Sequence, residues 1–135
     1  MDIGKRILAN QPFPTLMGVE IVTAEPARVV AKLHVRPDLC TAGNIMHGGA
    51  IMAFADALGA IGTVLAIPRE AGTTTIESKT NFIGSAKEGT TVTGESTPVH
   101  TGKRTSVWTT RITREDGKLV AIVTQTQMIL LPEKG

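Results

Sequence analysis

The sequence predicts a single α+β domain, in which a curved antiparallel sheet of about six strands wraps around one long central helix. An 18-residue apolar run at residues 50–67 predicts the helix, because it is long and stops at Pro68. A Thr- and Val-rich stretch from residue 73 onward predicts four strands, and two extended segments before the helix predict two more. With 135 residues, 41% of them apolar and 19% charged, the chain fits one globular domain spanning residues 1–135.

The N-terminal part is predicted to form a short helix followed by two strands. The helix covers residues 3–10 and ends before Pro12 and Pro14, since proline does not continue a helix. The strands cover residues 18–24 and 28–35, and every second residue of the latter segment is apolar. This period of two is typical of a strand with one buried face.

The four strands after the helix are expected to form antiparallel hairpins. Asp116-Gly117 separates the last two candidates, and this dipeptide is a strong hairpin signal. The expected strands are residues 73–84, 89–99, 105–114 and 119–131.

Asp56 is the only charged residue in the apolar run. Burying an ionisable group is costly unless something satisfies or uses it, so Asp56 is the first candidate functional residue. A membrane span is an alternative interpretation, because 18 residues nearly cross a bilayer. A carboxylate would add about 2.5–3.5 kcal/mol near the membrane centre, and the glycines of the run weaken its hydrophobicity, so a buried core helix is favoured.

Helical geometry divides the run into two faces. The face with Asp56 consists mostly of small residues, which permit close approach of a backbone, a second subunit or a ligand. The opposite face is bulky and is predicted to pack into the sheet. The small face contains Gly49, Met52, Ala53, Gly59, Ala60 and Thr63, and the bulky face contains Ile51, Phe54, Leu58, Ile61 and Leu65.

His47-Gly48-Gly49 follows a loop at residues 36–46 and leads into the helix. The first N–H groups of a helix are free and carry partial positive charge, and glycines let a ligand approach them closely. Such groups can polarise a carbonyl and stabilise its developing oxyanion. A tight turn with a structural histidine is the other interpretation of these three residues.

The composition argues against several other functions. Four aromatic residues, no tyrosine and a net charge of +2 offer neither stacking platforms nor a basic face for nucleic acid. The single Cys40 excludes an intrachain disulfide and a cysteine-cluster metal site. No G-x-S-x-G or H-E-x-x-H pattern occurs, so neither a Ser–His–Asp hydrolase nor a metal site is predicted. The N-terminus shows no secretory signal pattern, and we expect a cytoplasmic protein.

His47-Gly48-Gly49, with Asp56 nine residues after the histidine in an Ala/Gly-rich helix, resembles the hotdog-fold thioesterase superfamily, and within it the PaaI-like acyl-CoA thioesterases. The resemblance extends in order along nearly the whole chain. Residues 13–20 resemble the first strand of that family, residues 81–89 resemble a junction between strands, and residues 100–104 and 117–121 resemble its later hairpins.

This resemblance implies hydrolysis of an acyl-CoA or aryl-acyl-CoA thioester to free acid and coenzyme A. Asp56 would act as nucleophile or as general base on water, the Gly48 amide would polarise the carbonyl, and His47 would shape the pocket. In the family the glycine and the acid of one site come from different subunits, which implies a homodimer as catalytic unit and a homotetramer built as a dimer of dimers. No cofactor is implied, because coenzyme A is part of the substrate.

The resemblance also implies a set of substrate-binding residues. A polar residue on the strand after the helix often positions water. Basic residues commonly lie near the phosphates of coenzyme A, although two such residues also fit an ordinary solvated loop. Many relatives carry Asn or Gln six residues before the histidine, where this chain has Thr41. The implied residues are Asn44 as a substitute for that amide, Gly49, Thr74 or Thr75, Lys103 and Arg104.

Two other functions remain open at this point. A hotdog dehydratase or hydratase would act on acyl chains without cleaving the thioester, and the spacing from His47 to Asp56 fits a thioesterase better. A non-catalytic acyl-CoA-binding protein would bind the same ligand, although such a protein is expected to lose the carboxylate that this chain retains.

Overall fold

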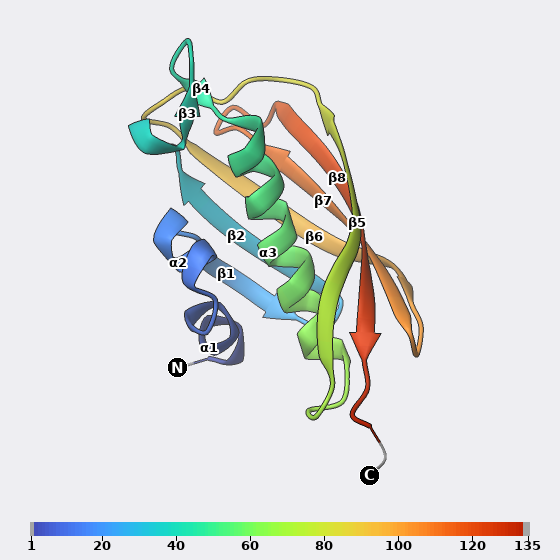
Figure 1. The fold of residues 1–135 in the computed structure, drawn as a ribbon. Coiled ribbons are helices and arrows are strands. Elements are labelled where there is room, and N and C mark those ends of the chain that lie inside the picture. The colour runs from blue at the N-terminus through green and yellow to red at the C-terminus, as the bar shows by residue number, and fades with distance from the viewer. Residues whose placement is uncertain (1, 134–135) are drawn as a thin grey trace.

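The computed structural model describes residues 2–133 and has the predicted α+β hotdog architecture (Figure 1). A six-stranded antiparallel sheet, with strand order β1-β2-β6-β7-β8-β5, curves around the long helix α3 (Gly48–Ala66). The strands are β1 (Glu20–Glu25), β2 (Arg28–His34), β5 (Gly72–Phe82), β6 (Thr91–Thr101), β7 (Thr105–Thr113) and β8 (Leu119–Leu130).

The N-terminal region corrects one prediction. The first helix, α1 (Ile3–Ala9), forms as expected, but residues that were expected to stop helical structure and enter a strand form a second short helix, α2 (Pro12–Met17). Pro12 stands at the first helical position, where its missing N–H is not needed, and Pro14 still lies in the first turn. Gly18, with a φ of 90°, ends α2 in the left-handed conformation that favours glycine.

The bulky face of α3 forms the core with the sheet, as predicted. Phe54, Leu58 and Ile61 are fully buried. Phe54 and Leu58 pack closely on the sheet because Gly94 of β6 has no side chain. A Cβ there would lie 2.9 Å from Leu58 Cδ2 and 3.0 Å from Phe54 Cε2. Glycine in a strand therefore marks a close approach of helix and sheet.

The small face of α3 is partly covered by the sheet, as the predicted close approach of another backbone allows. Gly59 and Thr63 share this face with Asp56, yet both are buried. The strands carry register irregularities that are typical of β-bulges, which bend a sheet, and the curved sheet covers this side of the helix as well. An open strip remains along α3, comprising Gly49, Met52, Ala53, Asp56 and Ala60, which are exposed or half-buried.

The loop before α3 contains short ordered pieces that the sequence did not predict. They are a 3-10 turn, η1 (Pro37–Leu39), and a two-stranded ribbon of β3 (Cys40–Thr41) and β4 (Ile45–Met46). The His47 N–H donates to the carbonyl of Leu39 in η1 (2.8 Å), so the end of this turn helps to set the position at which α3 begins.

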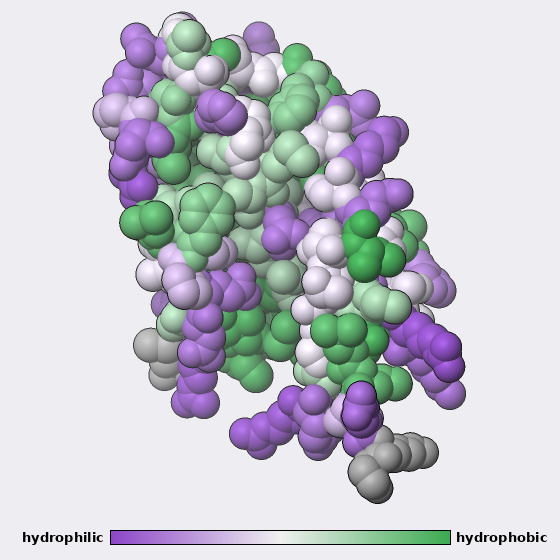
Figure 2. All heavy atoms as spheres, in the orientation of Figure 1, coloured by the Kyte–Doolittle hydropathy of each residue, from purple (hydrophilic) through white to green (hydrophobic). Residues whose placement is uncertain are grey.

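Strand β5 is one edge of the sheet, and β1 is the other. β5 is 11 residues long, and its Ile76 side chain is 56% exposed. A long edge strand presents unpaired backbone N–H and C=O groups that can pair with another chain. The face with α3 and β5 carries a broad band of apolar and near-neutral surface between more hydrophilic flanks (Figure 2).

By length and composition α3 could cross a membrane, but half of its most apolar window is buried in the fold. Its bulky residues contact the sheet, as the prediction of a buried core helix requires.

Candidate active site

Asp56 lies near the middle of α3, on the side that faces β5, and is half-buried. The Thr75 hydroxyl donates a hydrogen bond of 2.6 Å to Asp56 Oδ1. A short hydrogen bond to a charged acceptor is among the stronger ones in proteins. Of the two threonines implied by the family, Thr75 therefore contacts the acid, whereas Thr74 is exposed because neighbouring strand residues point to opposite faces.

Two glutamines of β8 lie beneath Asp56 and were not singled out from the sequence. Gln125 and Gln127 are both 0% exposed. The Gln125 amide lies 3.4 Å from both Asp56 Oδ1 and the Asp56 carbonyl, and Gln127 Nε2 donates to the Thr75 hydroxyl at 2.6 Å. Period-two alternation with the buried Val123 and Ile129 is the signal that could have placed both side chains inside.

Gly59 makes room for Gln125. A Cβ on Gly59 would overlap the Gln125 side-chain amide, so only glycine lets this side chain pass under the helix at this point. One amide oxygen, Gln125 Oε1, is buried and has no hydrogen-bond partner within residues 2–133. An unpaired buried acceptor costs free energy, on the order of 1–3 kcal/mol, and such a cost is commonly found next to functional groups.

The N-terminus of α3 presents a free backbone amide. His47 is the N-cap residue, and its Nδ1 accepts the Gly49 N–H at 2.8 Å. The Gly48 N–H, by contrast, has no acceptor among the described residues. It carries the partial positive charge of a helix start and is suited to bind a carbonyl oxygen or an oxyanion.

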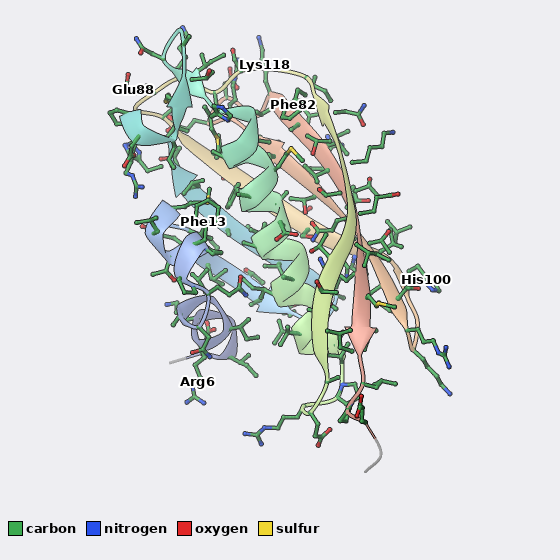
Figure 3. All side chains as sticks on the ribbon, viewed as in Figure 1. Arg6, Phe13, Phe82, Glu88, His100 and Lys118 are labelled. Atoms are coloured by element: carbon green, nitrogen blue, oxygen red, sulfur yellow. The ribbon has the colours of Figure 1, made fainter. Side chains whose placement is uncertain are left out.

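Phe82, at the end of β5, covers the α-carbon of Gly48. A Cβ on Gly48 would lie 3.1 Å from the edge of the Phe82 ring, which is itself 56% exposed. The side chain labelled Phe82 lies near the N-terminal end of α3 (Figure 3). This ring was not identified from the sequence, and it forms a wall beside the free amide.

Gly48 and Asp56 of one chain are too far apart to act on the same carbonyl. Eight residues along an α-helix correspond to about 12 Å of rise and about 80° of rotation. The acid and the amide of a single chain therefore belong to two different sites, or to one site that a second chain completes.

A cavity of about 330 Å³ opens beside the start of α3. It lies between α2, the residue 36–40 segment and the first turn of α3, and Phe13 on α2 is one of its walls (Figure 3). Its lining is mostly apolar and comprises Phe13, Leu16, Met17, Arg36, Asp38, Leu39, Cys40, His47, Gly49 and Ala50.

Cys40 in this cavity wall is not activated as a nucleophile. Its thiol donates to the Arg36 carbonyl at 3.3 Å. Loss of solvent around the thiol raises its pKa, and the negative charges of Glu88 and Asp38 raise it further. The thiol is therefore protonated at neutral pH.

The remaining predicted residues lie away from Asp56 of the same chain. Thr41 and Asn44 are exposed in the β3–β4 ribbon, where Asn44 adopts a φ of 58° and its carbonyl accepts the Glu88 N–H. Lys103 and Arg104 are exposed in the β6–β7 hairpin, and Lys103 lines a cavity with Ala66 and Ile67 at the C-terminal end of α3. Within residues 2–133, no three His, Cys, Asp or Glu side chains are grouped closely enough to hold a metal ion.

Comparison with known proteins identifies the class of this protein. The family model of the thioesterase superfamily matches residues 43–121. The 1,4-dihydroxy-2-naphthoyl-CoA hydrolase of Listeria monocytogenes is 31% identical over 106 residues, which are 78% of this chain and 85% of that protein. The chain therefore belongs to the thioesterase superfamily, and its class of activity is thioester hydrolysis.

Solved structures confirm the fold. A mutant thioesterase of Pseudomonas aeruginosa superposes with a TM-score of 0.87 at 22% identity, covering 96% of this chain and 95% of that one. A thioesterase protein of Streptococcus pneumoniae, solved with coenzyme A, gives a TM-score of 0.77 at 22% identity, covering 83% and 88%.

Proposed function

We propose that this protein hydrolyses an acyl-CoA or aryl-acyl-CoA thioester, with Asp56 as the catalytic carboxylate and the Gly48 amide as the oxyanion-binding group. The observation that carries the proposal is the environment of Asp56. An ionisable group in an apolar helix accepts the Thr75 hydroxyl on one oxygen, and no hydrogen bond to its other oxygen is found among the described residues.

In the general-base route, Asp56 Oδ2 removes a proton from a water molecule as the water oxygen bonds to the thioester carbon. The carbonyl becomes an oxyanion that accepts the Gly48 N–H. When the C–S bond breaks, the sulfur of coenzyme A takes the proton from Asp56, and the free acid is released. In the nucleophilic route, an Asp56 oxygen attacks the thioester carbon, the C–S bond breaks and coenzyme A leaves as the thiolate; water then hydrolyses the mixed anhydride, which releases the free acid and restores the Asp56 carboxylate. Both routes consume only the thioester and water.

We further propose that the catalytic unit is a homodimer. Two observations support it: Asp56 and Gly48 of one chain are about 12 Å apart along α3, and β5 is an edge strand of 11 residues with Ile76 exposed. Antiparallel pairing of two β5 strands about a twofold axis would join the sheets and bring the Asp56 of one subunit toward the partner's Gly48. The resemblance additionally implies a dimer of such dimers.

The substrate enters this proposal through two further features. The cavity of about 330 Å³ beside the first turn of α3 has the mostly apolar lining that an acyl or aryl group requires. Lys103 and Arg104 are exposed cations that could bind the phosphates of coenzyme A, and a similar fold has been solved with coenzyme A.

The first experiment measures free-thiol release from a panel of acyl-CoAs by the wild-type protein and the Asp56→Asn variant. Because a general base typically contributes about 10²–10⁴ in rate, we expect Asp56→Asn to lose that factor. Equal rates for the two proteins would contradict the proposal. So would addition of water to a crotonyl-CoA-type substrate in place of its hydrolysis, or tight binding without turnover of any substrate.

The second experiment separates the amide from the glycine side chain. Gly48→Pro removes the N–H at a helix position that tolerates proline, whereas Gly48→Ala retains the N–H and adds a comparable Cβ next to Phe82. We expect a loss of about 10²–10³ in kcat for proline and a much smaller loss for alanine.

Mixing the two inactive variants tests the shared site. In a dimer of one Asp56→Asn chain and one Gly48→Pro chain, one site is doubly impaired and the other is intact. After random exchange of subunits, about a quarter of the wild-type activity should therefore return. If the mixture remains inactive although size-exclusion chromatography and mass analysis show mixed dimers, the acid and the amide do not meet across an interface.

A further inference from the structure

A line of partly buried hydrogen bonds runs from Thr73 of β5 through Gln127 of β8 and Thr75 of β5 to Asp56. The Thr73 hydroxyl lies 2.9 Å from Gln127 Oε1, Gln127 Nε2 lies 2.6 Å from Thr75 Oγ1, and Thr75 Oγ1 lies 2.6 Å from Asp56 Oδ1. Gln127 is 0% exposed, so bulk water does not reach its side-chain amide. Gln127 is thus connected to the Asp56 carboxylate through Thr75, without a hydrogen bond of its own to that carboxylate.

The chemistry of the carboxylate fixes the direction of every bond in this line. An ionised Asp56 only accepts, so the single proton of the Thr75 hydroxyl must point to it. Thr75 Oγ1 must then accept from Gln127, and the group facing it is the Nε2 amide. Gln127 Oε1 therefore faces Thr73, whose hydroxyl donates to it and also lies 3.0 Å from the Met128 carbonyl.

Without Gln127 the Thr75 hydroxyl would lose the donor that directs its proton toward Asp56. Threonine hydroxyls rotate to suit their surroundings, and donors and acceptors in a buried network polarise one another. A second direct donor does not replace it, because Gln125 Nε2 lies 3.4 Å from Asp56 Oδ1, which is long for a hydrogen bond.

We propose that Gln127 is a positioning residue for the hydrolysis, acting through Thr75. It orients the Thr75 hydroxyl so that this hydroxyl holds Asp56 Oδ1, which leaves Oδ2 directed at water or at the thioester carbon. The proposal rests on the proposed function of Asp56. It adds that a residue of β8, Gln127, affects kcat together with Asp56 of α3 and Thr75 of β5.

The test is a double-mutant cycle on kcat with Gln127→Met and Thr75→Val, measured by thiol release from a single acyl-CoA at saturation. Methionine has a similar length to glutamine and does not donate to Thr75. We expect Gln127→Met to lower kcat by about tenfold with KM changed less than about twofold, because the lost interaction orients a catalytic group and does not bind substrate. We expect the double variant to match Thr75→Val alone, since Gln127 has no route to Asp56 once the hydroxyl is absent.

A matched control shows whether loss of buried polarity alone has this effect. Thr110 Oγ1 donates to Ser96 Oγ at 2.9 Å, and both residues are 0% exposed on strands of the same sheet. Thr110→Val should therefore lower the melting temperature to a similar extent as Gln127→Met while leaving kcat unchanged. If Thr110→Val lowers kcat as much as Gln127→Met, or if the Gln127 and Thr75 effects multiply, the positioning role is wrong.

Thr73→Val keeps the proposal testable if Gln127→Met does not fold. Thr73 is half-buried, and its loss removes the donor that holds Gln127 Oε1. We expect a smaller fall in kcat, of about threefold, that again disappears in the Thr75→Val background. An unchanged kcat would overturn the proposal.

Asp56→Asn separates a failure of the positioning role of Gln127 from a failure of the proposed function of Asp56. If it is inactive while the Gln127 and Thr73 variants match the wild type, only the role of Gln127 fails, whereas an active Asp56→Asn overturns the proposed function itself.

Discussion

On the core side of α3, Phe54 and Leu58 of the helix pack against Gly94 of β6, whereas on the acid side Gly59 of the helix packs against Gln125 of β8. Both contacts bring helix and sheet unusually close, and in both a glycine supplies the space. The bulky partner is apolar and belongs to the helix in the first case, and it is polar and belongs to the sheet in the second. Similar close packing thus stabilises the fold on one side and supports a carboxylate on the other.

The largest effect on the core side is expected for Phe54→Ala. Phe54 is fully buried, so its truncation should lower the free energy of unfolding by about 3–5 kcal/mol. Because Phe54 does not touch Asp56, kcat per folded molecule should stay within about twofold of the wild type. Urea denaturation together with active-site-normalised kinetics measures both quantities, and a large fall in kcat would show that the two sides of α3 are coupled.

On the acid side the corresponding change is Thr75→Val, with Thr74→Val as its control. Thr75 donates to Asp56, and Thr74 is exposed on the other face of the same strand. We expect Thr75→Val to lower kcat by about 10- to 100-fold, and Thr74→Val to lower it much less. Steady-state kinetics on one acyl-CoA decides the comparison. Equal losses would contradict a specific role of the Thr75 hydrogen bond to Asp56.

The two glycines provide a matched pair of smaller changes. Each alanine would crowd its partner and cost about 1–3 kcal/mol of stability, partly offset at Gly59 by the better helix propensity of alanine, which is worth about 1 kcal/mol. Gly59→Ala displaces Gln125 and should also reduce kcat, whereas Gly94→Ala should change stability alone. Thermal melts and kinetics on both variants test this, and a kcat loss limited to Gly94→Ala would reverse the assignment of the two faces.

The smallest effect is expected at a solvent-exposed ion pair, which contrasts with both buried contacts. Hydrogen bonds from Arg114, and then from the Lys118 backbone, hold the pKa of Asp116 at about 2, below its ordinary value of 3.8. Because the folded pKa is the lower one, this interaction stabilises the fold above pH 3.8 and is lost as the pH falls toward 2. Titration of the Asp116 carboxyl carbon by NMR should give a midpoint near 2 that rises in Arg114→Met. An unchanged midpoint would assign the shift to the backbone of Lys118.

The sequence predicted most of the helix and strand positions, because the signals there are local. Pro68 ends α3, Asp116-Gly117 forms its hairpin, and the bulky face of the helix is the core face. It was wrong about residues 12–17, because a proline at the first position of a helix starts it instead of stopping it. The small face of α3 was predicted to permit close approach of a backbone, a subunit or a ligand, but the sequence did not show that the curved sheet covers Gly59 and Thr63, because no local pattern reveals that curvature.

By itself, the sequence determined that an apolar helix carries a single carboxylate nine residues after His47, because charge and spacing along a chain are independent of the fold. Only the tertiary structure decided which groups surround that carboxylate. It brought together Thr75, Gln125 and Gln127 from strands that are 19 to 71 residues away in the chain, and it left Thr74 outside. The physical reason is that a hydrogen bond depends on distances of a few tenths of an ångström, and these are set by how closely α3 packs on the curved sheet.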